Sequence, residues 1–109
     1  MGKPDFQQVF KLGQKSVDAE LIVLARPNGL TRSRLGLAVA KKHTPRAVDR
    51  NRIKRLIRES FMHHQPFNIG IDAVVMNRTV TAQKNNQQIF QSLDNHWLKI
   101  STRLEQQDI

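Results

Sequence analysis

Residues 50–58 read Arg-Asn-Arg-Ile-Lys-Arg-Leu-Ile-Arg, and this order of polar and apolar residues predicts an amphipathic helix. Successive residues of an α-helix are rotated by about 100°, which puts Ile53, Leu56 and Ile57 on one side. That apolar side is expected to pack on a core, so the basic side is left to face solvent or a partner. The basic side consists of two neighbouring rows, Arg50, Lys54 and Arg58 in one and Asn51 and Arg55 in the other.

The basic side of this helix suits a polyphosphate backbone. Arginine offers a phosphate a planar fork of donors, lysine a mobile point charge, and asparagine both a donor and an acceptor. The alternative interpretation is a solvated basic face without a partner. Such faces usually alternate acids and bases at i, i+4 spacing, whereas residues 41–58 hold eight Lys or Arg and a single acid, Asp49. The pattern therefore favours nucleic-acid binding.

The whole chain is basic as well. Eighteen Lys or Arg against nine Asp or Glu give a net charge of +9 on 109 residues, with a pI near 10.9. A pI above about 9 with clustered charge is typical of proteins that bind nucleic acids. A membrane surface would attract the same charge, but that interpretation requires a basic helix with Trp, Phe and Leu opposite and no other role.

Length and residue usage set further limits. At this length we expect one domain, residues 1–109. No apolar run reaches the roughly 18 residues of a membrane span, and the first residues lack the apolar core of a signal peptide. The chain has no cysteine, which excludes disulfides and thiolate chemistry. These features favour a cytoplasmic protein.

Hydrophobic periodicity predicts alternating helices and strands. Thr44-Pro45 is a typical helix start, with a hydroxyl N-cap and a proline at the first helical position, and Gly13 is placed as the residue after the first helix. The order is α-β-β-β-α-β-α, which predicts an α/β (α+β) two-layer sandwich. The predicted ranges are helices over 5–12, 44–64 and about 20 residues around 89–104, and strands over 16–26, 34–40 and 69–77, with a short further strand near 15–18.

Small residues gather on one face of the strand over 34–40. Gly36, Ala38 and Ala40 share that face, opposite Leu35, Leu37 and Val39. Two interpretations are open. A helix packs closely on this face, or the space admits the backbone of another molecule. The first is the more common reason for such a stripe.

A search for catalytic residues finds little. The nine carboxylates are scattered, with no pair spaced for a metal cluster. His63 and His64 are adjacent, so on a helix their rings diverge by about 100° and cannot share a metal. No Ser/His/Asp constellation, P-loop or glycine-rich dinucleotide turn is evident. We therefore assign neither catalytic nor metal-binding residues to this polypeptide.

Phe6 and Phe10 are four residues apart, on one face of the first predicted helix. They are either core residues of a small domain or rings on which single-stranded bases stack, a contact that contributes about 1–3 kcal/mol per base. The sequence alone leaves both interpretations open.

Three segments together resemble the bacterial ribonuclease P protein component. The run from Arg50 to Phe61 closely resembles the Arg-Asn-Arg-x-Lys-Arg signature helix of that family. The run from Asp5 to Phe10, followed by Gly13, is similar to its first helix. The run from Arg34 to Lys42 is similar to its strand that ends in paired lysines. The resemblance covers about residues 4–104 with order and spacing intact. Three matching segments together are specific for this family, whereas one alone would only suggest it.

The resemblance implies an accessory subunit of an endoribonuclease. In this family the protein assembles with a catalytic RNA that holds the magnesium ions and removes the 5′ leader of precursor tRNA. The implied partners are that RNA and the precursor tRNA, with no membrane and no small-molecule substrate. A left-handed β-α-β crossover is implied as well. The implied RNA-subunit contacts are Arg46, Arg50, Asn51, Arg52, Lys54, Arg55 and Arg58, and the implied leader contacts are Phe6, Phe10, Lys41 and Lys42.

The chain departs from the family pattern on the second predicted strand, where Ile22, Val23 and Leu24 stand in place of a cleft-facing aromatic. Leader contacts are therefore expected to depend more on Phe6 and Phe10. Two other classes remain open. One is a ribosomal or general RNA-binding protein of related fold, and the other is a nuclease that acts without RNA, against which the scattered acids argue.

Overall fold

The computed structural model describes residues 2–65 and 67–107. Its helices and strands confirm the order α-β-β-β-α-β-α, and one short 3-10 helix, η1, is added before the last helix. The elements are α1 Lys3–Leu12, β1 Gln14–Val17, β2 Leu21–Pro27, β3 Arg34–Ala38, α2 Ala47–His63, β4 Ile71–Asn77, η1 Thr81–Gln83 and α3 Asn86–Gln107.

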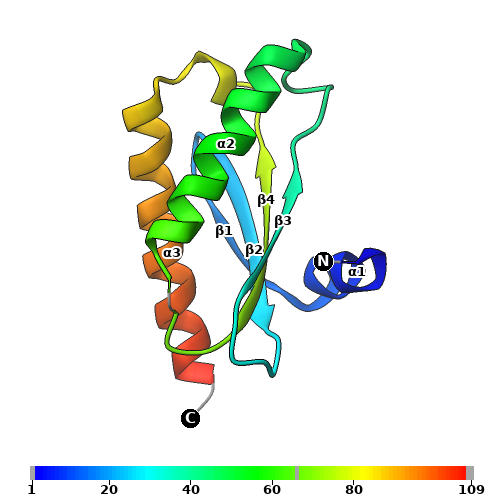
Figure 1. The fold of residues 1–109 in the computed structure, drawn as a ribbon, viewed down its shortest axis with the longest axis vertical. Coiled ribbons are helices and arrows are strands. Elements are labelled where there is room, and N and C mark those ends of the chain that lie inside the picture. The colour runs from blue at the N-terminus through cyan, green and yellow to red at the C-terminus, as the bar shows by residue number, and fades with distance from the viewer. Residues whose placement is uncertain (1, 66, 108–109) are drawn as a thin grey trace.

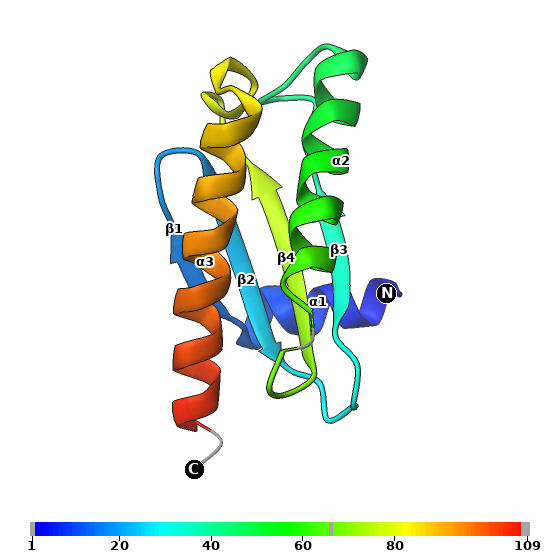
Figure 2. The same cartoon turned by 60° about the vertical axis from the view of Figure 1, so that its left-hand side comes forward.

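The four strands form one mixed sheet in the order β1-β2-β4-β3, in which only β3 and β4 are parallel. The helix α2 connects these two strands. Seen from the side of α2 with both strands pointing up, the chain passes from β3 on the right to β4 on the left (Figure 1, Figure 2). This is a left-handed crossover, against about 98% right-handed among such connections. It confirms the handedness that the resemblance implied.

The helices cover the two faces of the sheet unequally. Both α2 and α3 lie on one face, whereas α1 lies across part of the other (Figure 2). Side chains alternate between the faces along each strand, so Val23 and Val75 enter the core under α2 and α3, while Leu24 and Val74 pack on Val9 of α1. The two-layer sandwich is confirmed, and α1 adds a partial third layer.

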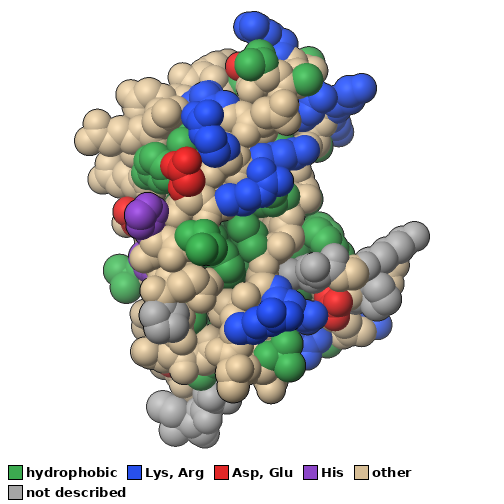
Figure 3. Space-filling model, in the orientation of Figure 1, with side chains coloured by type: hydrophobic (Ala, Val, Ile, Leu, Met, Phe, Trp, Pro, Cys, Tyr) green, Lys and Arg blue, Asp and Glu red, His purple; other side chains and the backbone are tan. Residues whose placement is uncertain are grey.

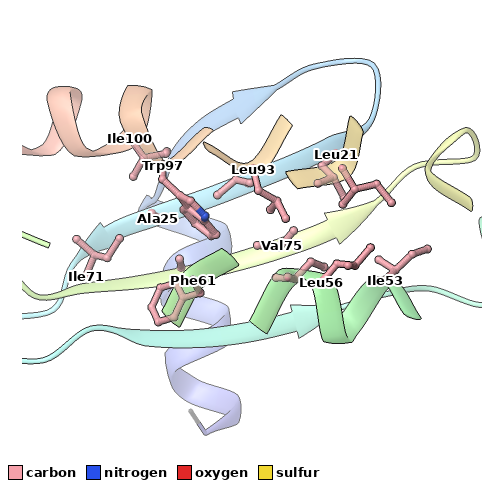
Figure 4. Packing of buried hydrophobic residues seen from close by; sticks show 14 of the residues in the cluster. Leu21, Ala25, Ile53, Leu56, Phe61, Ile71, Val75, Leu93, Trp97 and Ile100 are labelled. Carbon is pink, nitrogen blue, oxygen red and sulfur yellow. The ribbon is translucent and has the colours of Figure 1, made fainter. Parts of the chain in front are cut away.

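The core between the sheet and the two long helices is centred on Trp97. Its ring meets Phe61 edge to face, with ring centroids 5.6 Å apart, and Figure 4 shows both side chains between the helices and the sheet. The Trp97 Nε1 donates a hydrogen bond of 2.8 Å to the Ser60 hydroxyl. A buried indole N–H needs such a partner, and this bond joins α3 to α2 inside the core.

The stripe of small residues on β3 accommodates a helix. A Cβ placed on Gly36 would lie 2.5 Å from Cζ of the Phe6 ring, and Ala38 packs against the cluster around Val9. Glycine is needed at position 36 because the ring occupies the space of a side chain. The helix-packing interpretation is therefore confirmed for the part of the stripe nearest α1.

The start of α2 differs from the prediction. The helix begins at Ala47 after Arg46, and Thr44 is not its N-cap. Thr44 is buried, and its hydroxyl accepts a hydrogen bond of 2.8 Å from the side chain of Asn77, at the end of β4. Asn77, which lies 33 positions away in sequence, thus engages the hydroxyl that would otherwise cap the helix N-terminus.

Polar side chains fix α1 and the edge strand β3 at the end of the sheet where β3 and β4 begin. Arg34 donates to both carboxylate oxygens of Asp72, at 2.8 and 2.6 Å, and lies 3.4 Å from the Asp5 carboxylate on α1. Asn28 donates to Asp72 as well. Burial by itself would raise the pKa of Asp72, but the hydrogen bonds from Arg34 and Asn28 and the charge of Arg34 hold that pKa below its ordinary value.

Replacing Gly36 with Ala should destabilise the protein by about 1–3 kcal/mol, because the added methyl group overlaps the Phe6 ring. In a Phe6→Ala background the ring is absent, so the same change should cost much less. Urea unfolding of the four proteins of this double-mutant cycle measures the difference. Equal costs in the two backgrounds would show that Phe6 does not pack on Gly36.

Low pH should reduce the free energy of unfolding partly through protonation of Asp72. Because its folded-state pKa lies below the ordinary value of 3.8, the ionised carboxylate stabilises the fold above that pH, and the contribution is lost as pH falls through the folded-state pKa. Denaturant unfolding from about pH 6 down to about pH 2 measures this loss. In Asp72→Asn the free energy of unfolding should fall less steeply over the same range. If the free energy of unfolding fell equally steeply with pH in that variant, Asp72 would not be a source of the acid sensitivity.

Candidate RNA-binding interface

The outer surface of α2 is basic because the apolar residues of the helix face the core and its basic residues lie on the opposite side. Ile53, Leu56 and Ile57 are at most 1% exposed, which turns the polar residues of the helix outward. Figure 3 shows Lys and Arg side chains spread over this side of the molecule. The residues predicted to contact the RNA subunit divide into exposed Arg46, Asn51, Arg55 and Arg58 and half-buried Arg50, Arg52 and Lys54.

The side chains of α2 differ in what they already bind. Asn51, Lys54 and Arg58 have no side-chain hydrogen bond or ion pair to residues 2–65 or 67–107. Arg55 has only a long surface pair, 4.0 Å from Glu59, and exposed pairs of this kind contribute little. These donors are therefore free to bind a phosphate.

Two arginines of the predicted set donate hydrogen bonds to acceptors of the protein itself. Arg50 turns back and donates through Nη1 to the carbonyl oxygens of Thr44 and Pro45, at 3.1 and 2.6 Å. Arg52 reaches the segment before α3 and donates to Asn86 and to two backbone carbonyls of that segment. This division could not be predicted from the charge pattern, because it depends on acceptors outside the helix.

The sheet face beside α1 carries a second candidate surface. Residues paired across neighbouring strands form rows on this face, and α1 covers the row that contains Leu24 and Val74. We call the next row, toward the end of β3, the open row. Its Ala38 and Met76 also pack against the cluster around Val9, so the row is half-exposed, and Val17 at its margin is 46% exposed. The open row consists of Val17, Ile22, Met76 and Ala38.

Basic residues border the open row at the end of the sheet. A cavity of about 340 Å³ is lined by Ile22 together with His43 and Arg78. Lys41 and Lys42, predicted to contact the leader, are exposed in the turn that follows β3. The apolar row thus ends among cationic side chains.

The two predicted aromatic contacts lie in different surroundings. Phe10 is 47% exposed, whereas Phe6 is half-buried against Gly36. Phe6 lines a cavity of about 580 Å³ together with Arg58 and Met62 of α2, in the region where Figure 3 shows an apolar patch between Lys and Arg side chains. Both rings are thus partly exposed, and Lys41 is not among the residues that line the cavity of Phe6.

The structure brings together a Ser/His/Asp cluster that is not evident in the sequence. The Ser16 hydroxyl lies 2.7 Å from Nδ1 of His96, and Nε2 of the same ring lies 3.1 Å from the Asp18 carboxylate. These residues are up to 80 positions apart in sequence, so spacing could not reveal them. Ser16 and His96 are 3% and 1% exposed, which leaves no access for a substrate, and the cluster fastens β1 to α3.

No group of three or more His, Cys, Asp or Glu side chains placed to hold a metal ion occurs within the described part of the chain.

Among residues 2–65 and 67–107, no helix combines the length and apolarity needed to cross a bilayer.

Comparison with known proteins gives consistent matches over nearly the whole chain. The family model described as Ribonuclease P matches residues 1–101. The ribonuclease P protein component of Methylococcus capsulatus is 48% identical over 99 residues, which cover 91% of this chain and 77% of that protein. The corresponding protein of Pseudoalteromonas atlantica is 43% identical over 100 residues, which cover 92% and 83%.

Solved structures share the fold. The RNase P protein of Staphylococcus aureus superposes with a TM-score of 0.83 at 34% identity, covering 95% of this chain and 94% of that one. The RNase P protein of Thermotoga maritima gives a TM-score of 0.74 at 32% identity, covering 84% and 86%. With these matches, the left-handed crossover and the basic helix α2, the chain belongs to the ribonuclease P protein family.

Proposed function

We propose that this protein binds the catalytic RNA of ribonuclease P through the outer surface of α2, and the single-stranded 5′ leader of precursor tRNA through the sheet face beside α1. The observation that carries the proposal is a set of donors on α2, Asn51, Lys54 and Arg58, that no described residue engages, on a helix whose opposite side is buried. The apolar open row supports the second part.

The α2 surface is suited to a phosphate backbone. Arg55 and Arg58 present guanidinium forks to solvent, and a fork can make two parallel hydrogen bonds to one phosphate. Lys54 adds a charge on the same helix, and residues four apart are about 6 Å apart along its axis. Because the helix is fixed by its buried side, its backbone need not move for these donors to meet a folded RNA.

The surface beside α1 is suited to a single strand of RNA. The open row and Phe10 offer apolar and aromatic contacts to unstacked bases, and such contacts tolerate any sequence. Lys41 and Lys42 follow Ala38 of that row by three and four residues, so their charges can reach the phosphates of the same strand. Mature tRNA has no leader to occupy this surface.

The chemistry in this proposal belongs to the RNA subunit. Water attacks the phosphodiester at the junction, so the tRNA keeps a 5′-phosphate and the leader departs with a 3′-hydroxyl. Magnesium ions held mainly by the RNA and the substrate would supply charge stabilisation at that phosphate. The protein binds and orients the two RNAs. A general RNA-binding protein without a processing role would share the α2 surface, but it would not distinguish precursor from mature tRNA.

Binding to the RNA subunit should depend strongly on salt. If about five cations on and beside α2 neutralise phosphates, log K against log[salt] should fall with a slope on the order of −3.5 to −4.5. Replacing the exposed Arg55 with Ala should make this slope shallower by nearly one unit. Filter binding or fluorescence anisotropy at several salt concentrations measures it.

The matched control for Arg55→Ala is Lys99→Ala, which removes one exposed charge from α3. Its slope should change much less than that of Arg55→Ala. A slope near zero for the wild type, or equal changes in the two variants, would argue against phosphate binding by α2.

Phe10→Ala should weaken binding of precursor tRNA and leave mature tRNA affinity almost unchanged. The expected loss is about 1–3 kcal/mol if a base stacks on the ring. The melting temperature should change little, because the ring is 47% exposed. Affinity measurements with both tRNAs, and thermal unfolding of each variant, test this.

Leu12→Ala is the control for Phe10→Ala, since Leu12 is also exposed on α1 but has no ring. It should bind both tRNAs normally. Phe6→Ala should lower the melting temperature as well as leader binding, because Phe6 packs on Gly36. Equal losses for precursor and mature tRNA in Phe10→Ala would contradict a leader contact.

A further inference from the structure

Arg52 lies in the middle of the basic motif, yet its guanidinium is bound by acceptors of the protein itself. It is half-buried and crosses from α2 to the segment 82–86, which leads from η1 into α3. Nη1 donates to Oδ1 of Asn86 at 2.8 Å, and Nη2 donates to the carbonyl oxygens of Ala82 and Lys84 at 3.2 and 3.1 Å. One side chain of the motif helix therefore binds three residues that lie about 30 positions away.

These bonds limit what else the guanidinium of Arg52 can do. An arginine has five N–H donors, two of them on Nη2, and both of these are occupied. An arginine grips a phosphate bidentately either through Nη1 with Nη2 or through Nε with Nη2, so each fork needs an Nη2 hydrogen. Arg55 and Arg58 differ because, among residues 2–65 and 67–107, no hydrogen-bond acceptor engages their forks, and Arg55 has only the 4.0 Å pair between its Nε and Glu59.

We infer that Arg52 is a positioning residue, which holds the start of α3 against α2 and so sets the direction of the motif helix, and that it does not bind an RNA phosphate. The inference rests on the proposed function, since its main consequence is for RNA binding. It separates Arg52 from the other basic residues of the motif, with which the sequence grouped it.

The position of this contact explains its effect. Near its other end, α2 is joined to α3 by the bond from Trp97 to Ser60. Arg52 and Ser60 are eight residues apart, or about 12 Å along a helix. The buried side of α2 anchors the helix on the sheet, and two polar contacts at that separation add a further constraint on its direction relative to α3. Without the Arg52 contact, the basic end of the helix, with Arg46 and Asn51, is held less precisely.

The test compares alanine and lysine variants at positions 52 and 55 by their affinity for the RNA subunit and by the salt dependence of that affinity. Arg52→Ala should lower affinity by about tenfold or more, as expected for lost charge-assisted hydrogen bonds, while its log–log salt slope stays equal to that of the wild type. Arg52→Lys should be equally defective, because an ammonium keeps the charge but cannot span the three acceptors. Arg55→Ala should have a shallower slope, which Arg55→Lys restores.

Asn86→Ala provides a milder second variant that keeps Arg52 and all the charge. It should lower affinity with no change of slope, and adding it to Arg52→Ala should cause little further loss. A slope shallower by nearly one unit in Arg52→Ala, restored in Arg52→Lys, would overturn the inference, as would full affinity in Asn86→Ala. An unchanged slope in Arg55→Ala would instead count against the proposed function of α2.

Discussion

The burial of one side of α2 against the sheet and α3 is the constraint on which the rest of the structure depends. Ile53, Leu56 and Ile57 are withdrawn from solvent, and a helix anchored along one side has no freedom to rotate about its axis. The same contacts that stabilise the fold therefore decide which donors face outward. In this protein the residues that pack the core and the residues proposed to bind RNA lie on two sides of one helix.

The edge strand β3 links the two candidate surfaces. Its small face receives Phe6 of α1 at Gly36, its Ala38 belongs to the open row, and its end leads through Lys41 and Lys42 into α2. The left-handed crossover then carries the chain over the opposite face of the sheet (Figure 2). The surface proposed for the leader and the surface proposed for the catalytic RNA thus share one strand, so their relative position is fixed by a short piece of backbone.

Local pattern predicted most of the fold, because periodicity is a property of neighbouring residues. It failed where a distant residue intervened. The local pattern predicted Thr44 as an N-cap, but its hydroxyl accepts a hydrogen bond from Asn77 instead. Ser16 and His96 are 80 positions apart and meet only in the folded chain. Charge pattern likewise grouped Arg52 with Arg55, although Asn86 and two carbonyls bind Arg52 internally. The crossover hand has no local signature, and only the family resemblance implied it.

The central claim is that this chain is the protein partner of a catalytic RNA, and reconstitution tests it most directly. A bacterial ribonuclease P RNA is incubated with precursor tRNA at a magnesium concentration too low for the RNA to act alone, with and without this protein. The account predicts that the protein restores cleavage at the leader junction, that the tRNA product carries a 5′-phosphate, and that the protein without RNA cleaves nothing. Failure to restore cleavage, or cleavage by the protein alone, would contradict it.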